Sequence, residues 1–194
     1  MTMSLDKNAL RTASRAWPAP DPDDALLDAE RLAERVEGLE AFGAAHAVML
    51  YWPMSPREID VTPIARAALT LGKRVCIPRI DWVNRQMDPV ALPEWDEAHL
   101  ERSAKGVPGP NPALPTVNIE EIGLVIVPGI AFDAHCGRLG RGGGFYDRFL
   151  VRVGLAAARV GVAFDAQIIA GVPMDRHDTY MDAVVTPTRT FIRE

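Results

Sequence analysis

One stretch, residues 124–150, constrains the fold of this chain more than any other. It begins with the apolar run 124–127, which predicts a buried strand, and ends with residues 145–150, which predict the first turns of a helix. Between them lies a loop with five glycines from Gly137 to Gly144, in which we expect no side chain to fill a core. A strand, a glycine-rich loop and a helix in this order favour a backbone anion site, because crowded N–H groups and the helix N-terminus attract negative charge.

Two arginines, Arg138 and Arg141, lie within this loop. A purely structural turn does not need charged side chains, so the arginines favour anion binding over that alternative. The loop matches neither GxxxxGK[ST] nor GxGxxG, the two common phosphate-binding patterns, and the chain lacks the HRD and DFG motifs of protein kinases. The sequence therefore predicts an anion site of another kind.

Predicted strands and helices alternate along the chain. Strands are expected at residues 45–52, 73–78, 87–92, 120–127, 159–164, 182–186 and 189–192, and helices at 4–17, 24–42, 63–71 and from 145 onward. Gly72 is expected to end the third of these helices, and Gly154 to end or to interrupt the fourth. Two segments are expected to be irregular: residues 79–89, and the proline-rich residues 94–118, which form either a lid-like loop or a surface excursion. This alternation predicts one α/β domain over residues 1–194 with a largely parallel central sheet.

Composition excludes several classes of protein. The formal net charge of −5 argues against binding to nucleic acid or to an anionic membrane surface. No apolar run approaches the roughly 20 residues of a membrane span, and the N-terminus lacks the apolar core of a secretory signal. The two cysteines, Cys76 and Cys136, show no zinc-binding spacing. We therefore expect a cytoplasmic protein, which we also expect to be a monomer.

Charged residues outside the loop have two interpretations each. Lys7, Arg11 and Arg15 recur every four residues and share one helix face, which is either a solvated basic stripe or a cationic arm that reaches a phosphate. Glu58 and Asp60 follow a predicted strand and precede a helix, where a carboxylate either binds a ligand or caps the helix.

Two large apolar residues, Trp82 and Met87, stand in the segment that is expected to be irregular. They either fill the core or form a wall on which a flat ring stacks.

Residues 127–150, VPGIAFDAHCGRLGRGGGFYDRFL, resemble the signature of the 5-formyltetrahydrofolate cyclo-ligases, also called 5,10-methenyltetrahydrofolate synthetases. Further matches follow in the same order: Lys7, Arg11, residues 58–62 (EIDVT), 77–79 (IPR), Met87, 161–167 (GVAFDAQ), Pro173, 177–178 and 182–186. The resemblance implies a three-layer α/β/α domain similar to the ribose-5-phosphate isomerase and CoA-transferase group. The chain departs from the family at Gly109, where a Glu or Gln is often found.

The reaction implied by the resemblance depends on ATP and Mg²⁺. The formyl oxygen of 5-formyltetrahydrofolate attacks the γ-phosphate of ATP, the nearby 10-position nitrogen attacks the activated carbon, and phosphate leaves with 5,10-methenyltetrahydrofolate as product. Two alternatives stay open at this point. One is a related paralogue that uses ATP on a different substrate, and the other is a non-catalytic folate or nucleotide binder.

The resemblance also implies roles for individual residues. ATP would be bound by Lys7, Arg11, Arg138, Leu139, Gly140, Arg141, Gly142, Gly143, Gly144, Phe145 and Tyr146. The folate would be bound by Pro53, Glu58, Trp82, Met87, Arg141, Gly142, Gly143, Gly144 and Phe145. Arg141 and Tyr146 would be catalytic, and Asp147 and Asp178 would bind Mg²⁺. Asp147 could instead cap a helix, and Asp178 could instead pair with His177 or Arg176.

Overall fold

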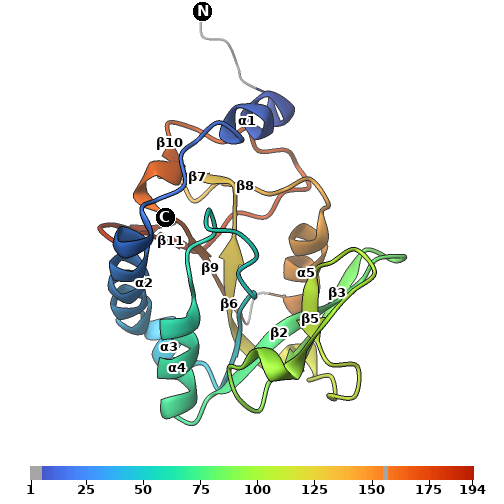
Figure 1. Cartoon of the computed structure of the whole chain (residues 1–194). Helices are drawn as coiled ribbons and strands as arrows, with labels where there is room; N and C mark the ends of the chain where they lie inside the picture. Colours follow the sequence, from blue (N-terminus) through green and yellow to red (C-terminus); the bar gives the residue numbers. More distant parts are fainter. Residues whose placement is uncertain (1–5, 155–156) are drawn as a thin grey trace, which may run out of the picture.

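The computed structural model describes residues 6–154 and 157–194, and within them a seven-stranded sheet lies at the centre (Figure 1). Its strand order is β12-β11-β9-β6-β1-β2-β3. The strands are β1 (Ala47–Met49), β2 (Arg74–Asp81), β3 (Gln86–Ala91), β6 (Ile122–Pro128), β9 (Ala158–Val162), β11 (Ala183–Val185) and β12 (Thr190–Ile192). Neighbours from β11 to β2 pair in parallel, whereas β3 and β12 pair antiparallel at the two edges. The prediction of a largely parallel central sheet is therefore confirmed.

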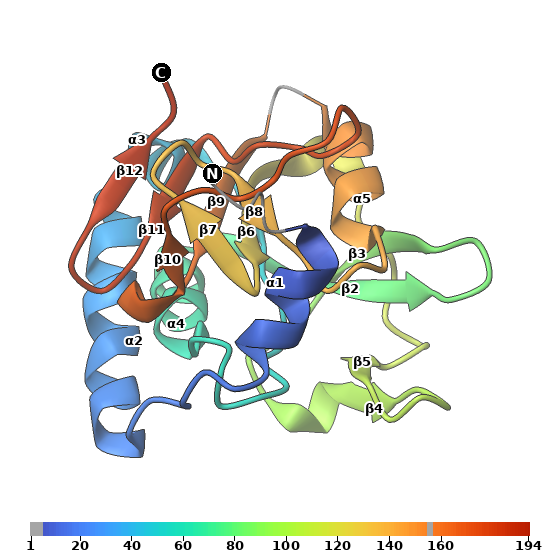
Figure 2. The same cartoon turned by 90° about the horizontal axis from the view of Figure 1, so that it is seen from above.

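Helices cover both faces of the sheet. The helices α2 (Pro22–Glu37), α3 (Glu40–Ala44) and α4 (Thr62–Thr70) lie on one side, and α5 (Phe145–Val153) lies on the other (Figure 1). Side chains of a strand alternate between the two faces, so Leu124 and Ile126 pack with the first group while Val125 and Val127 pack with α5. The result is the expected three-layer arrangement. A further helix, α1 (Lys7–Ser14), lies over the end of the sheet where β6 finishes (Figure 2).

Helix ends agree with the sequence at some positions and differ at others. Gly72 follows α4 with φ +71°, and Gly154 ends α5, as expected. The helix expected over residues 24–42 is wrong as a single element, because Leu39 adopts an extended backbone and separates α2 from α3. The helix expected at residues 4–17 is α1, although residues 4 and 5 lie outside the described part of the chain.

Residues 79–89, expected to be irregular, form most of a β2–β3 hairpin instead. The Asp81 carboxylate accepts hydrogen bonds from the N–H groups of Val83 (2.9 Å) and Asn84 (3.0 Å). Arg85 then closes the turn with φ +52°. An Asp-led turn of this kind lacks the glycine that usually marks a hairpin in a sequence, which explains the wrong prediction.

The glycine-rich segment also differs from the expectation, because part of it does fill a core. The strands β7 (Ala131–Asp133) and β8 (Arg138–Leu139) form a hairpin within it, and β10 (Ile168–Ile169) pairs with β7. Ala131, Phe132, Cys136 and Leu139 are buried. The buried Asp133 carboxylate holds this hairpin by accepting hydrogen bonds from backbone N–H groups, including that of Val172 at 2.7 Å. Only the later part of the segment, from Gly140 to Gly144, remains an open loop.

The proline-rich segment contains short regular elements. These are η1 (Glu97–His99), β4 (Leu100–Arg102) and β5 (Pro108–Pro110), with η2 (Ile119–Glu121) just after it and η3 (Asp165–Gln167) farther along the chain. The strands β4 and β5 pair as a two-stranded ribbon beside β2.

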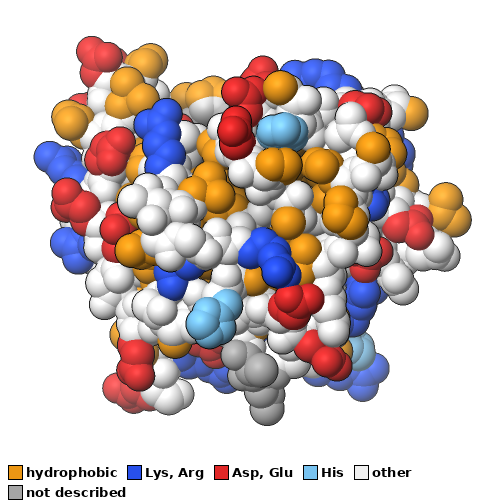
Figure 3. Space-filling model, turned by 90° about the horizontal axis from the view of Figure 1, so that it is seen from below, with side chains coloured by type: hydrophobic (Ala, Val, Ile, Leu, Met, Phe, Trp, Pro, Cys, Tyr) orange, Lys and Arg blue, Asp and Glu red, His pale blue; other side chains and the backbone are white. Residues whose placement is uncertain are grey.

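Of the helices in residues 6–154 and 157–194, none has the length and hydropathy needed to cross a bilayer. On the face seen from below, acidic and basic side chains are mixed among apolar ones (Figure 3).

Candidate functional site

A cavity of about 650 Å³ lies at the end of the sheet where β1 and β6 finish. Ligands of open α/β sheets bind at the carboxyl ends of the strands, and this volume is within the range of pockets that hold small molecules. Its walls come from α1, the loop after β1, the β2–β3 hairpin, the glycine-rich loop and the turn around Asp175. Segments that are far apart in the sequence therefore meet at one place.

The cavity contains nearly all of the predicted site residues. Those that line it are Lys7, Arg11, Glu58, Trp82, Met87, Arg138, Leu139, Gly140, Arg141, Gly142, Gly143, Gly144, Phe145, Tyr146, Asp147 and Asp178. Pro53 is the exception, since it is absent from the lining while its neighbours Trp52 and Met54 belong to it. The chain turns here so that the Met54 N–H faces Glu58, and this brings Met54 rather than Pro53 to the cavity.

Other lining residues were given no site role from the sequence. They are Tyr51, Trp52, Met54, Ile77, Pro78, Ile80, Val107, Pro108, Pro128, Gly129 and Asp175. Most of them are apolar side chains at strand ends or in the proline-rich segment. A pattern that is typical of a core cannot separate such residues from the wall of a cavity.

The open loop before α5 depends on glycine at two positions. Gly142 has φ +92° and Gly144 has φ +65°, which is backbone that other residues rarely adopt. Gly144 is the N-cap of α5 and supplies no side chain to cap the helix. The first N–H groups of α5 therefore stay available for a ligand at the cavity, as the anion-site prediction requires.

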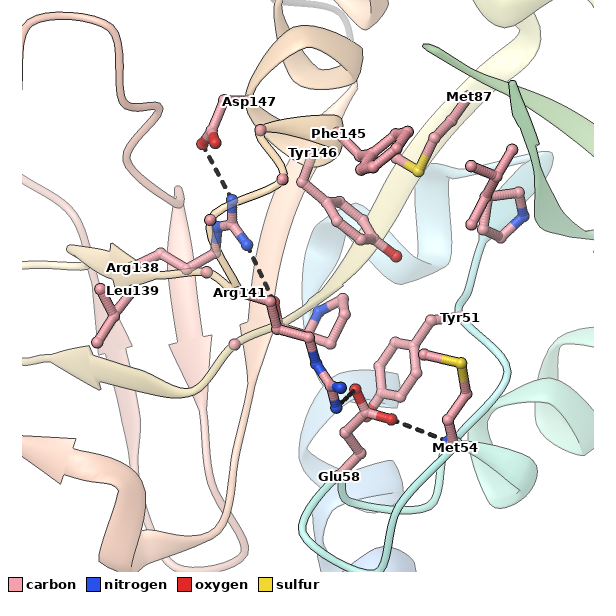
Figure 4. Close-up of a pocket in the computed structure, with 18 of the residues that line it drawn as sticks. Tyr51, Met54, Glu58, Met87, Arg138, Leu139, Arg141, Phe145, Tyr146 and Asp147 are labelled. Atoms are coloured by element: carbon pink, nitrogen blue, oxygen red, sulfur yellow. Dashed lines mark hydrogen bonds and ion pairs between the residues drawn. The ribbon is translucent and has the colours of Figure 1, made fainter. Parts of the chain in front are cut away.

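Arg141 and Glu58 form an ion pair across the cavity. The Arg141 Nη2 donates to Glu58 Oε1 at 2.7 Å, and the other carboxylate oxygen accepts from the Met54 N–H at 2.9 Å (Figure 4). The Glu58 side chain is only 8% exposed, whereas that of Arg141 is 61% exposed. Glu58 does not cap α4, because Asp60 accepts the Thr62 N–H at 2.8 Å. Glu58 therefore lines the cavity instead of capping the helix.

Arg138 is buried and tied to its surroundings. It donates through Nη2 to Asp147 Oδ1 at 3.0 Å and through Nη1 to the Pro128 carbonyl at 3.2 Å (Figure 4). Its guanidinium also lies 5.5 Å from the centroid of the Tyr146 ring. Arg138 thus joins the end of β6 to the first turn of α5, and Asp147 is its ion-pair partner in this arrangement.

The basic face of α1 divides into two parts. Lys7 forms ion pairs with Asp178 and, at 2.7 Å, with Asp175, and Arg11 donates to the Gly140 carbonyl at 2.9 Å. Arg15 is exposed and lies outside the cavity lining. Lys7 and Arg11 therefore line the cavity, whereas Arg15 lies on the exposed part of the same helix face.

The charge of Lys7 is stabilised where it lies. Burial alone would lower the pKa of Lys7, but the hydrogen bonds to Asp175 and Asp178 outweigh it and raise the pKa above its ordinary value of 10.5. Asp178 pairs with Lys7 rather than with His177 or Arg176, whose side chains hydrogen-bond to each other at 2.9 Å.

The other side of the cavity is apolar and aromatic. Trp82 meets Phe145 edge to face, with ring centroids 5.4 Å apart, and Met87 is buried beside them. Met87 belongs to the core and to the cavity wall at once. The Tyr146 hydroxyl is buried and has no hydrogen-bond partner in the part of the chain that is described (Figure 4). Burial raises the pKa of Tyr146, so the hydroxyl keeps its proton at neutral pH.

Comparison with known families identifies the family to which this fold belongs. Residues 5–187 match the model of the 5-formyltetrahydrofolate cyclo-ligase family. The chain belongs to this family. Its enzymes are ligases of folate one-carbon metabolism, and their reaction uses ATP as co-substrate. The chain is 31% identical to a 5-formyltetrahydrofolate cyclo-ligase of Mycolicibacterium smegmatis, in an alignment that covers 85% of this chain and 84% of that one.

Solved structures agree with this assignment. The NMR structure of Aquifex aeolicus 5,10-methenyltetrahydrofolate synthetase superimposes with a TM-score of 0.79 and 29% identity, over 96% of this chain and 92% of that one. A 5,10-methenyltetrahydrofolate synthetase from Mycoplasma pneumoniae gives a TM-score of 0.72 at 18% identity, over 94% of this chain and 99% of that one. The second likeness supports the fold alone.

Proposed function

We propose that this cavity catalyses the ATP-dependent cyclisation of 5-formyltetrahydrofolate to 5,10-methenyltetrahydrofolate. The observation that carries the proposal is the contact between Arg141 and Glu58, at 2.7 Å, where a cationic glycine loop meets a carboxylate on the aromatic side. The formyl oxygen must reach the γ-phosphorus of ATP, so the two substrates have to meet at such a boundary.

The reaction has two steps. In the first, the formyl oxygen attacks the γ-phosphorus, the bond from that phosphorus to the bridging oxygen breaks, and ADP leaves with the electron pair. In the second, the 10-position nitrogen attacks the activated formyl carbon and loses its proton. The carbon–oxygen bond then breaks, and the former formyl oxygen departs within inorganic phosphate.

The phosphate side acts by positioning and by charge. Backbone N–H groups from Gly142 to Tyr146 surround the terminal phosphates at the start of α5. Arg141 is mobile enough to follow them, because it is exposed and held by a single ion pair. Its guanidinium stabilises the charge that develops on the transferring phosphoryl group. Lys7 and Arg11 approach from α1, and the buried Arg138 positions the loop from behind.

The folate side orients the pterin and its formyl group. Glu58 accepts hydrogen bonds from pterin N–H groups once Arg141 has moved to the phosphates, since a carboxylate has acceptor sites only. The Tyr146 hydroxyl is buried and, among the described residues, without a partner, so it is available to donate to the formyl oxygen. Trp82 and Met87 supply the apolar wall.

Mg²⁺ belongs to the same proposal. Asp147 and Asp178 both line the cavity. The described residues contain no cluster of three or more His, Cys, Asp or Glu side chains that could bind a metal by itself. Two carboxylates suit Mg²⁺, which binds one or two of them and completes its shell with water and phosphate oxygens. When bound, the ion would neutralise charge on the phosphates of ATP. Asp147 and Asp178 would hold it after releasing Arg138 and Lys7 respectively.

Residues from Lys7 to Asp178 line one cavity, which supports a single domain over residues 1–194 that acts as a monomer. Free, buried Cys76 and Cys136 are compatible with a cytoplasmic location, which we include in the proposal.

A turnover assay tests the function directly. The purified chain is mixed with 5-formyltetrahydrofolate, ATP and Mg²⁺, and the absorbance of methenyltetrahydrofolate is followed, with ATP or Mg²⁺ omitted in parallel. We expect product only in the complete mixture. ATP binding without formation of methenyltetrahydrofolate would reject the proposal and would point to another substrate.

A further inference from the structure

A second cavity of about 190 Å³ opens beside the substrate cavity. The two share Ile80, Trp82, Val107 and Pro108 in their walls, so the smaller one continues the larger one past the indole of Trp82. Its volume falls below that of pockets that enclose a whole small-molecule ligand, so it suits one end of a longer molecule. The reaction steps described above do not use it.

The charges around the smaller cavity favour an anion. Arg79 and Arg102 line it together with a single acid, Glu101. Lys105 lies over Trp82, which both cavities share, with Nζ 4.4 Å from the centroid of the Trp82 ring. Three cations against one carboxylate make the local potential positive, and a positive potential in a concave site attracts carboxylates.

Both arginines keep free N–H groups. Among the hydrogen bonds of the described residues, Arg79 uses only Nη2, which donates to the carbonyls of Asn111 (3.1 Å), Leu114 (2.7 Å) and Pro112 (3.4 Å). Arg102 uses only Nη1, which donates to the Gly106 carbonyl at 3.0 Å. A guanidinium has five N–H donors, so each arginine can still bind a carboxylate, and Arg79 is already held in place.

The ribbon of β4 and β5 forms the outer wall of the smaller cavity. Gly109 lies on this wall, and a Cβ atom added to it would meet no heavy atom within 4 Å.

We propose that the smaller cavity binds the glutamyl carboxylates of the folate substrate. This inference rests on the proposed function, because 5-formyltetrahydrofolate carries a glutamate on the aminobenzoyl group, at the end remote from the pterin. The aminobenzoyl ring then lies against Trp82 and Pro108, and the glutamate reaches Arg79 and Arg102. Lys105 contributes a further cation from the turn between β4 and β5.

The test compares two substrates that differ only in the tail. These are 5-formyltetrahydropteroylglutamate and 5-formyltetrahydropteroate, which lacks the glutamate, each assayed at saturating ATP. We expect the wild-type KM for the tail-less compound to be about tenfold higher. In Arg102→Gln or Lys105→Gln, the ratio of the two KM values should fall about threefold, and in the double variant it should approach one. High salt should lower the wild-type ratio as well, because the contacts are exposed to solvent.

Arg66→Gln is the matched control, since Arg66 is exposed on α4 and lines neither cavity. Thermal melting checks that every variant is folded. A wild-type ratio near one, with both compounds turned over, would overturn this inference and leave the proposed function intact. A ratio that falls equally in Arg66→Gln would overturn it too. If neither compound were turned over, the proposed function itself would fail, and this inference would fail with it.

Discussion

The two sides of the cavity, which we assign to the phosphates of ATP and to the folate, differ in the side chains that form them. On the phosphate side, charged groups are already paired within the chain: Lys7 with Asp175 and Asp178, and Arg138 with Asp147. On the folate side, the wall consists of packed apolar and aromatic groups such as Met87, which belongs to the core. A ligand on the phosphate side must exchange ionic partners, whereas a ligand on the folate side meets a surface that packing has already fixed.

The largest effect should come from Arg141, where the two sides meet. Arg141→Ala should lower kcat about 100-fold to 1,000-fold, because the side chain stabilises charge that appears only during phosphoryl transfer. The melting temperature should change little, since the side chain is exposed. Methenyltetrahydrofolate absorbance under saturating substrates measures this, with Arg57→Ala as the control, because Arg57 is exposed and outside the lining. Full activity in Arg141→Ala would remove the catalytic assignment.

The second effect separates the two substrates. Glu58→Gln keeps the shape of the side chain but removes its charge, so the KM for 5-formyltetrahydrofolate should rise about tenfold. The KM for ATP should not rise, because Glu58 lies on the folate side. Varying each substrate in turn gives both constants, and Glu37→Gln on α2 serves as the exposed control. An equal rise in both KM values would contradict the division of the cavity.

A smaller effect is expected on the phosphate side from α1. Lys7→Ala should raise the KM for ATP about fivefold, because it removes one partly exposed cation from several. Arg15→Ala changes the same helix at an exposed position outside the cavity and should leave that KM unchanged. If the two variants behaved alike, the basic stripe would have no part in binding.

The smallest effect concerns pH. The hydrogen bond from Lys7 lowers the pKa of Asp175 below its ordinary value of 3.8. A carboxylate with a lowered pKa stabilises the folded state above the unfolded pKa, and that contribution is lost as pH falls through the folded pKa. The wild type should therefore melt slightly above Asp175→Asn from neutral pH down to about pH 4, and the gap should close at lower pH. Melting curves from pH 7 to pH 3 measure it, and a gap that widened in acid would have the wrong sign.

The same contrast explains what the sequence could predict. The open loop before α5 was predictable because its signal is local: Gly142, Gly144 and Arg141 are close in the chain, and their residue types indicate a loop that lines a site. The parallel sheet was predictable from the alternation of apolar strands with helices. The N-terminal arm needed its partners, and these lie 168 and 171 residues away at Asp175 and Asp178.

The apolar and aromatic side of the cavity was harder to predict, because its residue types are those of an ordinary core. Tyr51 and Pro108 give no local sign that they face a cavity. The β2–β3 hairpin that carries Trp82 is hidden by a turn that starts at Asp81 instead of a glycine. Phe132 and Leu139 were missed as core residues because the glycines around them suggested an open loop.

The ion pair between Arg141 and Glu58 has a consequence for how the two substrates influence each other. Under the proposed function, ATP would draw Arg141 away from the Glu58 carboxylate, which is 8% exposed, and a pterin N–H group would then supply the missing partner. When folate binds first, Arg141 is released toward the phosphates. Each substrate would thus break the Arg141–Glu58 ion pair, which competes with binding of the other substrate. Each would therefore bind more tightly when the other is already bound. By thermodynamic reciprocity, the factor by which ATP strengthens folate binding equals the factor by which folate strengthens ATP binding.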